Sequence, residues 1–255
     1  MEVITVGPDN IDREHICCAL SDKKGETGVS SKKAWLKERF ADGLVFKKLD
    51  VRGKAFIEYL PAEKAWIPLR ADGYLHIDCF WVSGKFQGHG YASQLLAECI
   101  AEAKAQGKLG LTVLSSEKKK PYLSNPAFLR HKGFRTADTA IPYFSLLYLP
   151  FEENSPVPRF RNCAKQGKIS EPGMVLYYAD QCPFAHEYAL KLGEIAQRRG
   201  LTVTLRKFET TEQAQNSPSP FPSYSFYYNG DFVTHEIFSE KRFETFLDLI
   251  STSGL

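Results

Sequence analysis

The chain has 255 residues, 43% of them hydrophobic and 25% charged, a balance typical of a globular protein with one or two domains. The net charge of +3 is too small to favour nucleic acid or a membrane as a partner, and no apolar run reaches the roughly 18 residues of a membrane span. Because residues 1–15 do not resemble a signal peptide, we expect a cytoplasmic protein whose six cysteines are thiols with irregular spacing and no metal site.

Residues 1–150 predict a mixed α/β domain. Strands are expected at 2–6, 43–51, 54–61, 73–82, 109–115 and 140–151, where β-branched and aromatic residues gather. Helices are expected at 10–20, 32–40, 90–106 and 124–134, where apolar residues recur every three or four positions. Asn10 or Asp12 would cap the first of these helices, and Cys17 and Cys18 within it are expected to be buried thiols.

A second unit is expected after a break in the pattern. Residues 151–172 are polar, contain three prolines and lack periodicity, so they predict a linker or an arm that crosses the surface. Residues 173–255 then predict a smaller α/β domain. Its expected elements are a strand from Met174, a helix at 183–199, a strand at 202–208, two strands within 217–238 that turn at Asn229-Gly230, and a helix at 239–250.

The turn between strand 73–82 and helix 90–106 contains Gly84, Gly88 and Gly90 and no acidic residue. The first N–H groups of a helix lack intrahelical partners and attract anions, and glycine lets a phosphate approach the backbone closely. The glycine spacing fits neither the G-x-G-x-x-G motif of dinucleotide folds nor the phosphate loop G-x-x-x-x-G-K-[ST]. The turn therefore predicts an anion site of another kind.

The sequence QGHGYA at 87–92 resembles the Q/R-x-x-G-x-G/A signature of the GNAT acetyltransferase superfamily. Together, segments 56–66, 81–96 and 128–134 resemble the YoaP-like N-acetyltransferases, a subgroup that also carries a thioredoxin-like C-terminal domain. The resemblance covers nearly the whole chain. It implies a GNAT fold with a mixed, largely antiparallel central sheet over 1–150, a linker, and a thioredoxin-like α/β domain over 173–255.

By this resemblance, acetyl-CoA is the acetyl donor. Its pyrophosphate would meet backbone N–H groups in the turn, Gln87 would brace the turn, and main-chain groups of Phe80 and Val82 would hold the pantetheine arm. His89 would be a solvent-facing neighbour of the phosphates. The basic segment 117–121 is either a solvated loop or a further phosphate contact. The residues expected to offer N–H groups to the pyrophosphate are Gly88, Gly90, Ala92 and Ser93.

The resemblance implies an acyltransferase that moves the acetyl group directly to a primary amine, most simply on a small molecule. An ammonium must first lose a proton, and His76, Asp78 and Glu58 are the candidate bases. Strand alternation predicts one shared face for Tyr74, His76, Asp78, Phe80 and Val82. His76 falls where many relatives hold a catalytic glutamate, and the N–H of Phe80 or Val82 is expected to stabilise the thioester oxygen.

One position departs from the family pattern. Many relatives have a tyrosine four residues before the glycine of the late GF pair, and here that position is Leu129. Tyr122 and Tyr143 are the alternatives for a general acid, although a thiolate also leaves without one. The acceptor site would be lined by aromatic residues, for which Trp35, Phe40, Trp66 and Tyr74 are candidates unless they serve the core.

In the second unit, Cys182 stands at a strand-to-helix junction, where a helix N-terminus lowers a thiol pKa. The resemblance makes Pro222 a cis-proline beside this thiol. Ala185 occupies the place of a second cysteine, so single-thiol chemistry aided by His186 competes with a role in packing or substrate recognition. Two alternatives to small-molecule acetylation stay open: an acyl-CoA-binding thiol protein without transferase activity, and acetylation of a protein lysine. The oligomeric state, monomer or homodimer, is also open.

Overall fold

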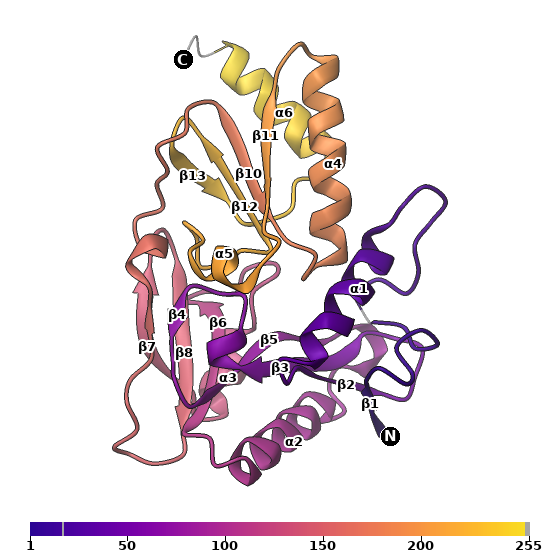
Figure 1. Cartoon of the computed structure of the whole chain (residues 1–255), viewed down its shortest axis with the longest axis vertical. Coiled ribbons are helices and arrows are strands. Elements are labelled where there is room, and N and C mark those ends of the chain that lie inside the picture. The colour runs from indigo at the N-terminus through magenta and orange to yellow at the C-terminus, as the bar shows by residue number, and fades with distance from the viewer. Residues whose placement is uncertain (17, 253–255) are drawn as a thin grey trace.

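The computed structural model describes residues 1–16 and 18–252, and its larger sheet has seven strands in the order β1-β2-β3-β5-β6-β8-β7 (Figure 1). Neighbouring strands are antiparallel except β5 and β6, which are parallel. The predicted mixed, largely antiparallel sheet is therefore confirmed. The strands are β1 Val3–Val6, β2 Val45–Leu49, β3 Ala55–Pro61, β5 Tyr74–Val82, β6 Gly110–Ser116, β7 Arg135–Ala140 and β8 Phe144–Pro150.

Helices cover both faces of this sheet. In Figure 1, α2 (Tyr91–Ala105) lies below the sheet, and α1 (Gly28–Phe40) lies above it on the side of the second unit. The short helix α3 (Pro126–His131) begins at Asn125, whose side chain accepts the N–H groups of Ala127 and Phe128. Burial of one apolar stripe of α2 against β3, β5 and β6 fixes the helix below the strand that feeds the glycine turn.

One predicted helix of the first unit is wrong, and one predicted strand has a wrong start. Residues 10–16 and 18–20 form turns and bends rather than a helix, because the Asn10 side chain accepts the Gly7 N–H and donates to the Thr5 carbonyl, which closes the chain locally. The predicted strand 140–151 begins late, at Phe144, after a turn with a cis Ile141–Pro142 bond, and the preceding strand β7 was missed. Cys17 lies outside the described residues, and Cys18 is half-buried.

The segment 151–172 is anchored to the first unit. Its strand β9 (Arg159–Phe160) pairs with β4 (Leu69–Arg70), and the Phe160 ring is buried. Lys165 binds the Asp138 carboxylate at 2.8 Å. The segment thus crosses the surface of the first unit with its backbone and one side chain fixed.

The second unit contains a four-stranded sheet in the order β11-β10-β12-β13, in which β10 and β11 are parallel and the other pairs antiparallel. Helices α4 and α6 pack on one face of this sheet, and its other face is turned toward the first unit (Figure 1). The elements are β10 Met174–Tyr178, α4 Pro183–Arg198, β11 Val203–Lys207, α5 Thr211–Gln215, β12 Tyr224–Tyr228, β13 Asp231–Thr234 and α6 Glu240–Thr252.

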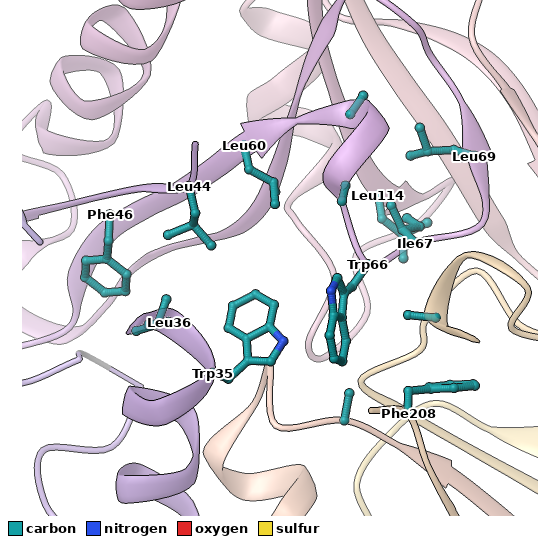
Figure 2. Packing of buried hydrophobic residues seen from close by; sticks show 14 of the residues in the cluster. Trp35, Leu36, Leu44, Phe46, Leu60, Trp66, Ile67, Leu69, Leu114 and Phe208 are labelled. Atoms are coloured by element: carbon teal, nitrogen blue, oxygen red, sulfur yellow. The ribbon is translucent and has the colours of Figure 1, made fainter. Parts of the chain in front are cut away.

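One hydrophobic cluster spans the two units, and the second unit has a further cluster of its own. Trp35 of α1 meets Trp66 edge-to-face with ring centroids 5.5 Å apart, and Phe208 of the second unit belongs to the same cluster (Figure 2). The Trp66 indole N–H donates to Thr211 Oγ1 at 3.0 Å. Because the shared cluster continues across the junction, the units are held in one arrangement. In the part of the chain described, no helix combines the length and apolar character needed to cross a membrane.

The junction is also polar. The N-terminus of α1 receives no cap from the Thr27 side chain, but Glu187 of α4 accepts the N–H groups of Thr27 and Gly28. Asp22 accepts the next two N–H groups of this helix. Carboxylates at a helix N-terminus are stabilising, so part of the stability of α1 comes from the second unit.

Candidate active site

A groove opens where β5 and β6 part. Their pairing ends at Ile77 and Val113, although both strands continue. Beyond this point lies a groove of about 710 Å³. It is lined by all of the predicted coenzyme-binding residues except His89, which is exposed beside it. The predicted residues that line the groove are Phe80, Val82, Gln87, Gly88, Gly90, Ala92 and Ser93.

The glycine turn forms one end of this groove. Gly88 and Gly90 have φ values of 78° and 79°, and a Cβ on either would point into open space. Gly90 caps α2 without any side-chain hydrogen bond, so the first N–H groups of the helix are left for a ligand. The Gln87 side chain donates to the Val82 carbonyl at 3.0 Å and ties the turn to β5. Lys119 and Lys120, from the basic segment, line the same groove.

A second cavity, of about 380 Å³, lies between the two units. It shares Phe80, Trp81, Pro121 and Leu123 with the groove, so the two spaces meet at the end of β5. We call this second space the junction cavity. The second unit contributes Gln181, Cys182, Phe184, Pro220, Phe221, Pro222 and Ser223 to its wall.

A β-bulge in β5 shapes this meeting point. Glu58 of β3 pairs with Cys79 and Tyr59 pairs with Ile77, so Asp78 is an extra residue without a partner on β3. The predicted shared face is therefore wrong beyond Ile77. His76 and Asp78 both line the junction cavity, whereas Phe80 and Val82 pack with the cluster under α2, although Phe80 also lines the cavity where it meets the groove. Bulges re-aim side chains in this way and leave main-chain groups unpaired near active sites.

Asp78 is held by groups from both units. Gln181 donates its side-chain N–H to Asp78 Oδ1 at 2.9 Å, and Ser223 donates to the other end of the same amide at 3.2 Å. Glu58 is fully buried, and its Oε2 accepts from Lys32 Nζ at 2.7 Å. Lys32 also donates to the Gln181 carbonyl at 2.7 Å. The four side chains Lys32, Glu58, Asp78 and Gln181 form what we call the junction network.

The protonation states within this network follow from burial and charge. Burial and the neighbouring Glu58 carboxylate raise the pKa of Asp78 well above its usual range. Glu58 Oε1 has no other hydrogen-bond partner in the described structure, and a proton on Asp78 supplies one. Burial alone would lower the pKa of Lys32, but the Glu58 carboxylate outweighs it and raises this pKa. Asp78 thus holds a proton more readily than an ordinary carboxyl group does, next to the ion pair of Glu58 and Lys32.

The His76 imidazole is a weak base in this structure. It is 2% exposed and its Nδ1 lies 3.0 Å from Thr112 Oγ1. Burial lowers the pKa of His76 to about 3. The ring is therefore neutral at physiological pH and holds a proton only weakly, which favours Asp78 over His76 among the candidate bases.

The predicted thiol site differs in three respects. Burial raises the pKa of Cys182 to about 11, although N–H groups of Phe184 and Ala185 oppose the rise, so the expected lowering is wrong. Pro222 lines the cavity together with Cys182 but follows a trans bond, so the expected cis-proline is wrong. His186 binds Asp180 and Thr27 through its ring nitrogens rather than a thiolate. Cys18 and Cys79 line the same cavity.

Of the alternatives for a general acid, Tyr122 lines the junction cavity, and the Tyr143 hydroxyl pairs with His235 Nδ1 at 2.7 Å. Leu129 is buried and lines the groove. Of the aromatic candidates for the acceptor site, Trp66 lines the cavity, while Trp35, Phe40 and Tyr74 belong to the core.

Sequence reasoning missed two members of the junction network, Lys32 and Gln181. Lys32 is one of several lysines in the same helix. Gln181 lies next to Cys182, whose thiol is the more obvious candidate for chemistry. Their contact spans 149 positions of the chain. No local pattern marks either residue, because their roles arise from the packing of α1 against the second unit.

Comparison with known proteins agrees with this architecture. The acetyltransferase (GNAT) family matches residues 15–123, and the YoaP-like family matches residues 203–245. A Bacillus subtilis (strain 168) protein named "Uncharacterized N-acetyltransferase YoaP" is 43% identical over 248 residues, which cover 97% of this chain and 99% of that protein. The chain belongs to the YoaP-like N-acetyltransferases of the GNAT family. The predicted family and acyltransferase class are confirmed.

Two solved structures of N-acetyltransferases are similar to part of this chain. PaiA N-acetyltransferase of Thermoplasma acidophilum, in complex with coenzyme A, is 14% identical and has a TM-score of 0.39, with 59% of this chain and 100% of that chain covered. Ribosomal-protein-alanine N-acetyltransferase of Brucella melitensis is 17% identical with a TM-score of 0.40, over 58% and 97% of the two chains.

Proposed function

We propose that this N-acetyltransferase moves an acetyl group directly from acetyl-CoA to a primary amine of a small molecule bound in the junction cavity. The supporting observation is the contact between the two spaces, since Phe80 and Trp81 line both. Acetyl-CoA in the groove and an amine in the cavity would meet beside Phe80 and Trp81, with no part of the protein between them. Such an arrangement suits transfer in a ternary complex, which gains its rate from positioning.

On the donor side, the groove offers what the coenzyme requires. The N-terminus of α2 and the open space over Gly88 and Gly90 suit a pyrophosphate, and Lys119 and Lys120 suit its remaining negative charge. The free edge of β5 beyond Ile77 suits the pantetheine arm. An N–H beside the bulge, on Phe80 or Val82, would stabilise the thioester oxygen as negative charge develops.

On the acceptor side, Asp78 serves as the base. In its ionised form the carboxylate takes one proton from the bound ammonium, and the amine nitrogen then attacks the thioester carbon. The C–S bond breaks, the nitrogen gives up its second proton to solvent or to the tyrosinate of Tyr122, and the thiolate leaves with a proton from Tyr122 or from solvent. A base with a raised pKa is well matched to an ammonium near neutral pH, and this favours Asp78 over Glu58, which lies behind it against Lys32.

For the second unit we propose a thioredoxin-like fold that serves as the far wall of the acceptor site. The parallel β10-α4-β11 unit followed by the β12-β13 hairpin and α6 supports this interpretation. A thiol with a pKa of about 11 is protonated at neutral pH, so Cys182 serves in packing rather than in redox chemistry.

Replacement of Gly90 tests the donor site. In the Gly90→Ala variant, the methyl group enters the space proposed for the pyrophosphate, and the positive φ adds about 1 kcal/mol of strain. We expect acetyl-CoA binding, measured by calorimetry, to weaken at least about tenfold, and amine-dependent release of CoA to fall with it.

Gly107→Ala is the matched control, because Gly107 follows the other end of α2, has φ 64° and also faces open space. This variant should lose stability but bind acetyl-CoA normally. Equal loss of binding in both variants, or normal binding in Gly90→Ala, would contradict the assignment of the groove.

Gln181 tests the acceptor side through pH dependence. Its N–H favours the ionised form of Asp78 and so lowers the pKa of that carboxyl. Without this donor the pKa rises, and the ascending limb of kcat/KM against pH should move to higher pH in Gln181→Ala. Ser223→Ala, which loses only the donor that orients Gln181, should show a smaller shift in the same direction. A reduced rate with an unmoved pH profile would leave Gln181 with a structural role alone.

A further inference from the structure

The walls of the junction cavity are mainly apolar and aromatic. The first unit contributes Trp66 and Leu114, and the second contributes Phe184 and Phe221. The neighbouring Cys18 thiol and burial raise the pKa of Cys79, and burial raises the pKa of Cys182, so both thiols act as small apolar groups. Pockets with such walls bind the apolar parts of small molecules and exclude water from them.

The charges of the cavity are few. Among the described residues that line it, Asp78 is the one acidic side chain, and its pKa is raised by burial and by Glu58. Glu58 itself is fully buried and paired with Lys32. A molecule with several ammonium groups would leave all but one of them without a carboxylate in an apolar space, and each unpaired ammonium would lose its hydration without compensation.

A lysine in the cavity wall adds to the selection against molecules with several positive charges. Lys54 lines the cavity, and its ammonium lies 5.8 Å from the centre of the Phe184 ring. Residues 54 and 58 stand four positions apart along one extended segment, which places their backbones about 13 Å apart. One end of the cavity is therefore acidic and the other basic, so a second positive charge on the acceptor would be repelled.

We propose that the acceptor is a monoamine on an apolar, ring-containing body, not a polyamine, an aminoglycoside or a protein lysine. This inference rests on the proposed function. The amine meets Asp78 beside the end of the groove, and the body lies against Phe184 and Phe221 of the second unit. The second unit therefore determines specificity in an enzyme whose donor site belongs to the first.

The test compares kcat/KM for 2-phenylethylamine and tryptamine with values for spermidine, kanamycin and a lysine-containing peptide, with CoA release as the readout. Higher values for the two aromatic monoamines support the inference. Equal or higher values for any of the other three overturn it and leave the transferase proposal standing. If acetyl-CoA binds but no amine is acetylated, the proposed function fails and the inference fails with it.

The Phe184→Ser variant then tests whether the second unit determines specificity for the amine. We expect the KM for 2-phenylethylamine to rise about tenfold or more while the KM for acetyl-CoA stays unchanged. Leu190→Ser is the matched control on the same helix, since Leu190 is 43% exposed and lies outside the cavity wall. An unchanged amine KM in Phe184→Ser, or the same increase in Leu190→Ser, would overturn the role assigned to this wall.

Discussion

Asp78→Asn is expected to lower kcat by about 10²- to 10⁴-fold, which is the usual contribution of a positioned base. The substitution removes the proton acceptor and little else. The new amide side chain would keep the oxygen that accepts from Gln181 and would offer an N–H to Glu58 Oε1. The KM of the variant for acetyl-CoA should stay near the wild-type value, because Asp78 lines the junction cavity and not the groove.

The pH profile adds a second readout. In the wild type, the base must be ionised, so kcat/KM should rise with pH toward the raised pKa of Asp78. Asp78→Asn should lose this ascending limb. The stability effect has the opposite sign: a carboxyl whose pKa is raised by folding stabilises the native state at low pH and loses that contribution as pH rises. The variant should therefore unfold no more easily than the wild type at neutral pH.

His76→Gln is the decisive comparison, because His76 is one of the three candidate bases named from the sequence. The amide that replaces the imidazole can still pair with Thr112, so the fold should be kept. We expect less than about a tenfold loss of kcat from this variant, because a neutral imidazole with a pKa of about 3 is a poor proton acceptor. A loss as large as that of Asp78→Asn would return the role of base to His76.

The residues predicted to bind the coenzyme line one groove because they are nearly contiguous in the chain. Strand β5, the glycine turn and the start of α2 occupy one stretch from Phe80 to Ser93, so local patterns describe the whole site. The acceptor side was predicted poorly because it depends on tertiary structure. Strand alternation placed His76, Asp78 and Phe80 on one face, but one extra residue at the bulge changes the direction of every side chain after it.

In the second unit, too, a feature that depends on tertiary structure was not predictable from the sequence. The position of Cys182 at the start of α4 predicted a lowered pKa, since helix N-termini stabilise thiolates. Cys182 lies half-buried at the junction with the first unit, and the cost of partly burying a charge there exceeds the benefit of the N–H groups of Phe184 and Ala185. Most helices and strands of each unit were therefore predictable from local periodicity, but the chemistry at the junction of the units was not.

Lys32→Met should produce the largest loss of stability, about 3–5 kcal/mol, because it leaves the Glu58 carboxylate buried without a counter-charge. The side chain is 1% exposed and of similar length to methionine, so packing changes little. The substitution also removes the donor to the Gln181 carbonyl, which links α1 to the second unit. Urea unfolding followed by circular dichroism measures the effect.

Two companion variants give this prediction its controls. Lys37→Met removes an exposed ion pair with Asp12 on the same helix and should cost less than about 1 kcal/mol. Lys32→Met combined with Glu58→Gln removes both charges and should recover much of the loss, because an unpaired buried charge costs more than a neutral pair. If Lys32→Met costs no more than Lys37→Met, the buried pair does not stabilise the junction.

Because one hydrophobic cluster spans both units, the wild type should unfold in a single transition. A separate early transition in Lys32→Met would show that this lysine couples the two units.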